Sequence, residues 1–202
     1  MILFALAGQK AVVACNTIRG CTLTSGSHGR SITPLSITAG GHFLEIGMSL
    51  KNCRIILVPV DFSRDSLEAV DQSLVLAKSL NVDLLLLHVV HDLCDTPGSY
   101  HKTEAGEERV RKMTETAQEM MAEFIAENDL EIRTKRAGAK LSVRIKRGLP
   151  TTQIIQLAKH EKAGLIAMGS KGRTGLANLV MGSTAERVVR LASVPVMVVK
   201  HN

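Results

Sequence analysis

A glycine-rich stretch between residues 169 and 183 carries the residue types best suited to chemistry. It reads Gly-Ser-Lys-Gly-Arg-Thr-Gly-Leu-Ala-Asn-Leu-Val-Met-Gly-Ser, and it includes Gly169, Gly172 and Gly182. Glycine permits a tight turn and a close approach of a ligand to the backbone, which a Cβ atom would obstruct. Unpaired N–H groups and the helix dipole favour an anion at a helix N-terminus. The stretch therefore predicts an anion-binding loop that ends where a helix begins, at Gly182 and Ser183.

Several side chains of this stretch could contact a phosphate group. Lys171 and Arg173 supply mobile positive charge, and the Ser183 hydroxyl can donate to a phosphate oxygen, with Thr184 beside it. The stretch matches neither GxxxxGK[ST] nor GxGxxG. It therefore lacks the lysine on which ordinary P-loop hydrolysis depends.

A purely structural interpretation of the same stretch remains open. Ser183 and Glu186 have the spacing of a capping box, in which each side chain satisfies a backbone donor at the start of a helix. Glycines that follow a strand are also common as simple turn residues. The spacing alone does not choose between a cap and a ligand site.

The elements that must position this loop alternate regularly from Lys51 onward. Short apolar runs typical of strands buried on both faces alternate with segments of helical spacing. The predicted strands are 54–60, 82–90, 141–146, 164–168 and 195–199, and the predicted helices are 63–81, 104–128, a segment from Pro150 and 183–192. This order predicts an α/β fold with a doubly wound, mainly parallel five-stranded sheet and helices on both faces.

For two of the predicted helices the sequence indicates a specific cap or buried face. Ser63 is placed to cap the first helix, and the long helix 104–128 has a predicted buried stripe. The stripe consists of Val110, Met113, Ala117, Met120, Met121 and Phe124. The basic residues between 131 and 140 are expected to form an irregular, solvated loop.

Residues 1–47 differ in composition from the rest of the chain. They contain one acidic residue, Glu45, are rich in Ser, Thr and Gly, and keep no helical or alternating period. A signal peptide and a transit peptide are two interpretations, although no charge precedes the apolar start and arginine is sparse. The favoured interpretation is an irregular extension outside the natural protein, which would begin at Met48. The predicted domain is then 48–202.

Composition excludes several functional classes. Among 202 residues there are four Phe, one Tyr and no Trp, too few aromatic rings to stack single-stranded nucleic acid. No apolar run reaches the roughly 18 to 20 residues of a membrane-spanning helix. The net charge of +6 favours anionic partners mildly, and one anionic ligand would account for it. The four cysteines show no CxxC pair, which favours a reducing, cytoplasmic location. From the scarce aromatic rings and the short apolar runs, neither a nucleic-acid nor a membrane partner is expected.

The weaker signals have structural interpretations. His88, His91 and Cys94 lie close together in sequence, but no second cluster completes a set of metal ligands. Structural histidines are therefore favoured, and no metal site or catalytic residue is assigned.

The spacing Gly169-x2-Gly172-x9-Gly182-Ser183 resembles the nucleotide-binding signature of the universal stress protein family. The likeness extends over about residues 51–200. The matching segments are Ile56-Leu-Val-Pro-Val-Asp-Phe-Ser63 (first strand and turn), Leu86-Leu-His-Val89 (second strand), Gly148-Leu-Pro150 (entry to the third helix) and Ser193-Val-Pro-Val-Met-Val-Val199 (last strand).

This resemblance implies a parallel sheet of strand order 3-2-1-4-5 with a ligand at its switch point, between strands 1 and 4. In ATP-binding members, the position of Asp61 holds the nucleoside, and Val60 and Val89 would border the adenine. The positions of Gly169, Gly172, Gly182 and Ser183 would cradle the phosphates. The implied ligand is ATP, with Mg²⁺. Two departures are Gly164, where many relatives have Asp, and Lys171, where His is frequent.

The resemblance also implies a regulatory role, in which nucleotide occupancy signals to partners during stress. Family members pair through the last strand, so a homodimer through Val196 and Val198 is expected, because an apolar edge strand is costly to leave open. Two alternatives stay open. One is slow ATP hydrolysis or self-phosphorylation, and the other is a nucleotide-free subunit that binds a protein partner.

Overall fold

The structure is a computed structural model that describes the backbone of residues 2–5, 11–15, 36–39, 42–45, 53–91, 104–172 and 181–200. Side chains are described for 53–91, 106–172 and 181–200. Arg173 lies outside the described residues.

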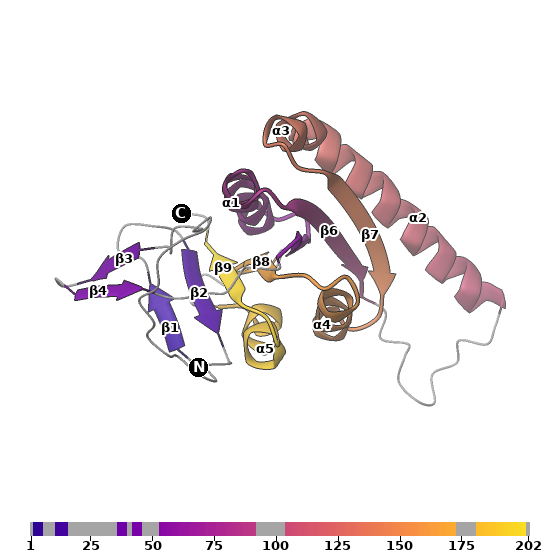
Figure 1. Ribbon diagram of the computed structural model, residues 1–202. Helices are drawn as coiled ribbons and strands as arrows, with labels where there is room; N and C mark the ends of the chain where they lie inside the picture. The colour runs from indigo at the N-terminus through magenta and orange to yellow at the C-terminus, as the bar shows by residue number, and fades with distance from the viewer. Residues whose placement is uncertain are drawn as a thin grey trace.

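A parallel sheet forms the centre of the molecule (Figure 1). Its strands are β5 (Ile55–Pro59), β6 (Asp83–Val90), β7 (Leu141–Arg147), β8 (Leu165–Gly169) and β9 (Val196–Val199). They lie in the order β9-β8-β5-β6-β7, and every adjacent pair is parallel. Counted along this part of the chain, the order is 3-2-1-4-5, so the predicted fold is confirmed.

The helices cover both faces of this sheet (Figure 1). They are α1 (Arg64–Leu80), α2 (Glu104–Glu127), α3 (Leu130–Arg136), α4 (Pro150–His160) and α5 (Ser183–Leu191). Residues of α1, α2 and α3 pack in one core, and residues of α4 and α5 pack in the other. Strand β5 supplies both cores, because Ile56 and Val58 face the first and Leu57 faces the second. All three are fully buried, as the apolar run predicted.

The start and end of α1 follow from local chemistry. Ser63 is its N-cap, and the Ser63 hydroxyl accepts a hydrogen bond from the Ser66 N–H at 3.2 Å, as predicted. Asn81 ends the helix in the left-handed region at a φ of 54°, a conformation that asparagine adopts more readily than most residues.

The region after α2 differs from the expectation. The predicted loop within 131–140 is wrong, because α3 begins at Leu130 and continues to Arg136. Leu130 is fully buried, and the Arg133 guanidinium lies 2.6 Å from the Asp71 carboxylate on α1. Arg133, Lys135 and Arg136 occupy the last turn, where positive charge is favoured by the helix dipole.

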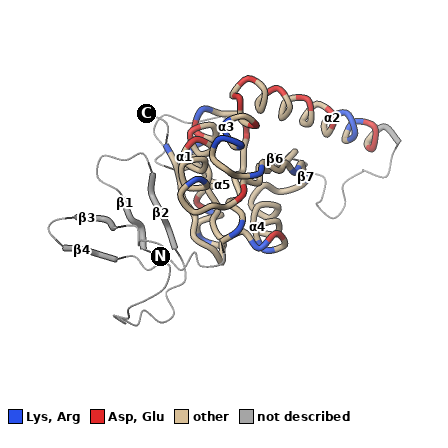
Figure 2. Tube along the Cα trace, turned by 45° about the horizontal axis from the view of Figure 1, so that its top comes forward, with Lys and Arg blue, Asp and Glu red and all other residues tan. Residues whose placement is uncertain are grey.

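The buried stripe of α2 is shorter than predicted. Ala117, Met121 and Phe124 are buried, whereas Met113 is 42% exposed. Acidic residues recur along the helix, and basic residues lie toward its N-terminal end (Figure 2). There Glu108 forms ion pairs with Arg111 and Lys112.

Four short strands lie in the N-terminal segment, where the sequence shows no persistent period. They are β1 (Ile2–Ala5), β2 (Ala11–Cys15), β3 (Ser36–Ala39) and β4 (His42–Glu45). Strands β3 and β4 form a separate two-stranded sheet, and β1 and β2 extend the main sheet. Strand β2 pairs antiparallel with β9, with Val12 opposite Val198. The prediction that β9 is an edge strand is therefore wrong for the whole chain, since β2 satisfies the backbone groups that an edge would expose.

Among the described residues, none of the helices combines the length and the apolar character that a bilayer span requires.

Candidate functional site at the carboxyl ends of β5 and β8

The switch point of the sheet lies at β5, which pairs in parallel with both β6 and β8. The chain leaves β5 toward α1 on one face and leaves β8 toward α5 on the other. Ligands of doubly wound sheets bind in the crevice that this reversal creates. Asp61 follows β5, and Gly169 ends β8. The structure brings the two segments into contact, because a Cβ atom on Gly172 would lie 2.8 Å from Oδ2 of Asp61.

The carboxylate of Asp61 is held by the turn that begins α1. Its Oδ1 atom accepts hydrogen bonds from the Ser63 N–H at 3.1 Å and from the Ser63 hydroxyl at 2.6 Å. Because Ser63 is also the N-cap of α1, the orientation of this carboxylate is tied to the start of the helix. The other carboxylate oxygen, Oδ2, is the atom that lies beside Gly172.

Phe62 adopts an unusual backbone conformation next to Asp61. Its φ is 65°, in the left-handed region that bulky residues rarely enter, at a cost on the order of 1 to 3 kcal/mol. Its ring stacks on His88 with centroids 4.4 Å apart, and Phe124 contacts it edge-on at 5.7 Å. Aromatic pairs contribute about 0.5 to 1.5 kcal/mol each beyond burial, so the two contacts offset the backbone strain.

His88 has a structural role, as the sequence favoured. Its Nδ1 atom lies 2.8 Å from the carbonyl oxygen of Val60, immediately before Asp61. Together with the stacking on Phe62, this contact fixes the chain on both sides of Asp61. Within the part of the chain that the structure describes, no group of three His, Cys, Asp or Glu residues is arranged to hold a metal ion.

The side chains of the two valines assigned to the base pack on opposite faces of the sheet. Val60 is 4% exposed and belongs to the core under α1, and its N–H donates to the Leu87 carbonyl at 2.8 Å. Val89 is half-buried and packs against the core on the opposite face of the sheet. The structure therefore gives these two side chains different surroundings.

The start of the glycine loop is packed against α1. A Cβ atom on Gly169 would lie 2.8 Å from the carbonyl carbon of Asp65 and 3.0 Å from the backbone nitrogen of Ser66. Oδ2 of Asp65 accepts hydrogen bonds from the Ser170 hydroxyl at 2.8 Å and from the Lys171 N–H at 2.9 Å. No motif in the sequence identifies Asp65 or Ser170, because their contact joins residues that are far apart in the chain.

The N-terminus of α5 differs from the predicted capping box. Gly182, and not Ser183, is the N-cap, and it makes no side-chain cap bond. Ser183 is the first helical residue and is exposed, while Thr184 is half-buried. The reciprocal cap between Ser183 and Glu186 is therefore wrong, because the helix begins one residue too early for Ser183 to be its N-cap. Glu186 instead donates its N–H to the Gly182 carbonyl at 3.0 Å.

Cys53 accounts for the unusual Gly164. A Cβ atom on Gly164 would overlap Cβ and Sγ of Cys53, so the aspartate that the family resemblance implied at this position does not fit here. Burial raises the pKa of the Cys53 thiol, although backbone hydrogen bonds from Gly164 and Ile55 oppose that shift. Such a thiol is poorly suited to nucleophilic chemistry at neutral pH.

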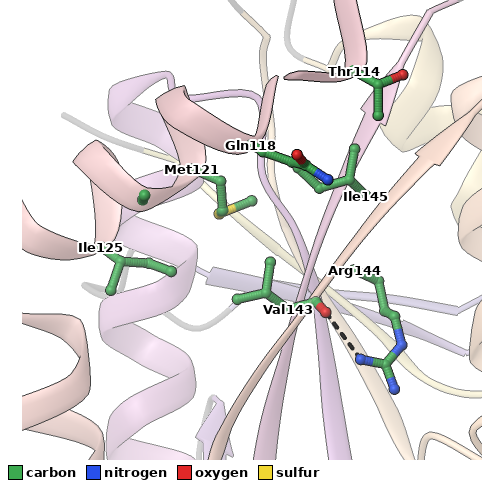
Figure 3. Close-up of a pocket in the computed structure, with 8 residues that line it drawn as sticks. Thr114, Gln118, Met121, Ile125, Val143, Arg144 and Ile145 are labelled. Carbon is green, nitrogen blue, oxygen red and sulfur yellow. Dashed lines mark hydrogen bonds between the residues drawn. The ribbon is translucent and has the colours of Figure 1, made fainter. Parts of the chain in front are cut away.

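A groove of about 410 Å³ lies between α2 and β7, away from the switch point (Figure 3). Its lining is mainly apolar, including Met121, Ile125, Val143 and Ile145. Arg144 turns away and donates to the Val143 carbonyl at 3.0 Å. The groove holds none of the residues assigned to the site, and its chemistry does not favour a charged ligand.

The universal stress protein family model matches residues 52–200. Universal stress proteins MJ0531 and MJ0577 of Methanocaldococcus jannaschii are 32% and 29% identical to the chain. Each alignment covers 72% of this chain and, respectively, 81% and 94% of the relative.

Solved structures show the same fold. The structure of MJ0577 has a TM-score of 0.58 at 29% identity and covers 74% of this chain and 96% of its own. The structure of universal stress protein UspA from Lactobacillus plantarum has a TM-score of 0.59 at 26% identity, with coverage of 72% and 96%. A universal stress protein structure in complex with cAMP and one in complex with dAMP align with the chain at 23% and 17% identity, each with a TM-score of 0.46. The extent of the family match shows that this chain belongs to the universal stress protein family.

Proposed function

We propose that this protein binds ATP at the carboxyl ends of β5 and β8, and that occupancy of this site acts as a regulatory signal in the stress response. The observation that carries the proposal is the start of α5. Gly182 caps the helix without a side-chain bond, so its first N–H groups are not occupied by a capping side chain. An anion is the ligand that a helix N-terminus of this kind favours.

The glycine loop supports the choice of phosphate as that anion. Gly172 is exposed and lies beside Asp61, and the Gly182 N–H is bonded to Ser170, so both ends of the loop meet at the crevice. In the proposed complex, the backbone of Gly169, Gly172 and Gly182 surrounds the phosphates. The side chains of Lys171, Arg173, Ser183 and Thr184 complete the phosphate contacts.

The nucleoside end is assigned to the other side of the crevice. Asp61 would accept hydrogen bonds from the ribose or the base, and Val60 and Val89 would border the adenine. The proposal assigns Mg²⁺ to the phosphates of the bound ATP, because phosphate oxygens and one or two carboxylates are its usual ligands.

Calorimetric titration of ATP with Mg²⁺ into the full chain tests the proposal. Binding in the micromolar range is expected, with affinity lowered at least about tenfold in Asp61→Ala and in Gly182→Val. Gly182 has an ordinary φ of −74°, and a Cβ there meets Ser170 only at 3.4 Å, so the valine variant is expected to fold. No heat of binding to folded wild-type protein would contradict the proposal and would favour a nucleotide-free subunit.

The proposal includes a cytoplasmic homodimer formed through Val196 and Val198 of β9. In the full chain β2 covers that edge, so a dimer requires β2 to be absent or displaced. A chain that starts at Met48 lacks β2, and relatives such as MJ0577 consist almost entirely of the region that matches this domain. Light scattering at micromolar concentration is expected to give a dimer mass for the Met48 chain. A monomer mass would contradict it.

A further inference from the structure

The carboxylate of Asp65 joins the start of α1 to the start of the glycine loop. Its Oδ2 atom accepts bonds from the Ser170 hydroxyl at 2.8 Å and from the Lys171 N–H at 2.9 Å. Asp65 lies in the first turn of α1, directly after the turn that holds Asp61. One carboxylate thus connects the two segments that carry the candidate ligand contacts.

Ser170 connects Asp65 to the start of α5 through hydrogen bonds. It is 4% exposed, its N–H donates to the Val199 carbonyl at 2.6 Å, and its carbonyl accepts from the Gly182 N–H at 2.7 Å. Ser170 is therefore fixed by Asp65 through its side chain and by β9 through its backbone. A movement of Ser170 would displace Gly182, the N-cap of α5.

The close packing of Gly169 makes this arrangement specific. A Cβ atom on Gly169 would lie 2.8 Å from Cβ of Asp65, so only glycine lets β8 end this close to α1. The helix dipole alone would explain an acidic residue in the first turn of α1. It does not explain why one oxygen atom accepts two hydrogen bonds from residues 105 and 106 positions away. Bonds to an ionised acceptor are also shorter and stronger than bonds between neutral groups.

We propose that Asp65 is the positioning residue of the glycine loop. It holds Ser170, and through Ser170 it holds Gly182, where the N–H groups of α5 can receive a phosphate. This inference rests on the proposed nucleotide site, although Asp65 itself is not among the residues assigned to contact the nucleotide.

Three substitutions at Asp65 separate positioning from charge. Asp65→Ala removes both bonds and is expected to lower ATP affinity about tenfold, as two ordinary hydrogen bonds imply. Asp65→Asn keeps one carbonyl oxygen in place and is expected to retain affinity within about threefold. Asp65→Glu keeps the charge near the helix terminus but displaces the oxygen atoms, so it should resemble the alanine variant. If Asp65→Glu binds like wild type and Asp65→Asn does not, the charge is what matters and the positioning role is wrong.

A double-mutant cycle tests the connection to Ser170. Ser170→Ala removes one of the two bonds, and the double variant with Asp65→Ala should bind no more weakly than Asp65→Ala alone. If the losses in ATP affinity of the two single variants add up in the double variant, Asp65 does not act through Ser170. Asp71→Ala is the matched control, because Asp71 lies on the same helix and loses its contact with Arg133, 2.6 Å away. Its ATP affinity should stay within about twofold of wild type, since it does not touch the loop.

Amide hydrogen exchange gives a readout that needs no nucleotide. In Asp65→Ala, the amides of Lys171 and Gly182 should exchange about tenfold faster or more, while the Gln153 amide on α4 keeps its rate. Failure of wild type to bind ATP, with this exchange pattern intact, would refute the nucleotide site and support the positioning role. Unchanged exchange at Gly182, together with equal ATP affinity, would refute the positioning role alone.

Discussion

Asp61 and Gly172 are in contact at the switch point: a Cβ atom on Gly172 would lie 2.8 Å from Oδ2 of Asp61. One residue follows the first parallel strand, and the other follows the fourth. The glycine at 172 is thus explained by the carboxylate that lies against it, and not by backbone conformation, because its φ is not in the left-handed region.

Gly172→Ala should therefore weaken ATP binding without destabilising the fold. The added methyl group meets the far end of a side chain, which can move, so the free energy of unfolding should change by less than about 1 kcal/mol. The displaced Asp61 carboxylate should cost about three- to tenfold in ATP affinity. Calorimetry and urea denaturation measure the two effects, and unchanged affinity would show that the position of Asp61 does not matter for binding.

Gly169→Ala, in contrast, should destabilise the fold. Here the methyl group meets the backbone of α1, with the carbonyl carbon of Asp65 at 2.8 Å and the nitrogen of Ser66 at 3.0 Å. Neither atom can move without shifting the helix, so a loss of about 1 to 3 kcal/mol in the free energy of unfolding is expected. Urea denaturation measures it, and Gly172→Ala is the matched control. Equal denaturation midpoints for the two variants would contradict the close packing of β8 on α1.

Cys53 should make stability depend on pH in the alkaline range. Burial raises the pKa of its thiol above the ordinary value of 9.0, so the folded chain holds this proton more tightly than the unfolded chain does. Its contribution to stability is complete below pH 9.0 and is lost as the pH rises from there through the folded-state pKa. The measurement is the difference in free energy of unfolding between wild type and Cys53→Ala from pH 7 to 10.5. Above pH 9, wild type should lose stability relative to Cys53→Ala. A difference in free energy of unfolding that stays constant with pH would contradict the effect of burial.

The elements of the parallel domain were predictable because each has a strong local pattern. The strand at Ile55–Pro59 is apolar throughout since it is buried on both faces, and Ser63 caps α1 through a bond within its own turn. Helix α3 was missed because it has only seven residues, and two buried residues, Leu130 and Thr134, give no clear period. Its stability comes partly from the Arg133–Asp71 contact, which local sequence does not reveal.

The candidate site was predictable in its glycines and in Asp61, but not in the contacts that hold them. The spacing from Gly169 to Ser183 identified the loop, whereas Asp65 and Ser170 act through tertiary contacts that leave no motif. The sequence does not fix the first residue of α5 to better than one position. Because α5 begins at Ser183, Gly182 is its N-cap and Ser183 is not. Strand β2 beside β9 could not be predicted, because pairing across an edge depends on which strand is available.

The central claim is that the uncapped N-terminus of α5 binds phosphate, and Gly182→Asp with Gly182→Asn tests it most directly. Both side chains are better N-caps than glycine, by a few tenths of a kcal/mol, so neither variant should lose stability. The aspartate would place a negative charge where the phosphate is proposed to lie. Calorimetric titration of ATP with Mg²⁺ should show binding abolished, by about 100-fold or more, in Gly182→Asp and a smaller loss in Gly182→Asn. Equal ATP affinity of wild type and a folded Gly182→Asp variant would contradict the claim.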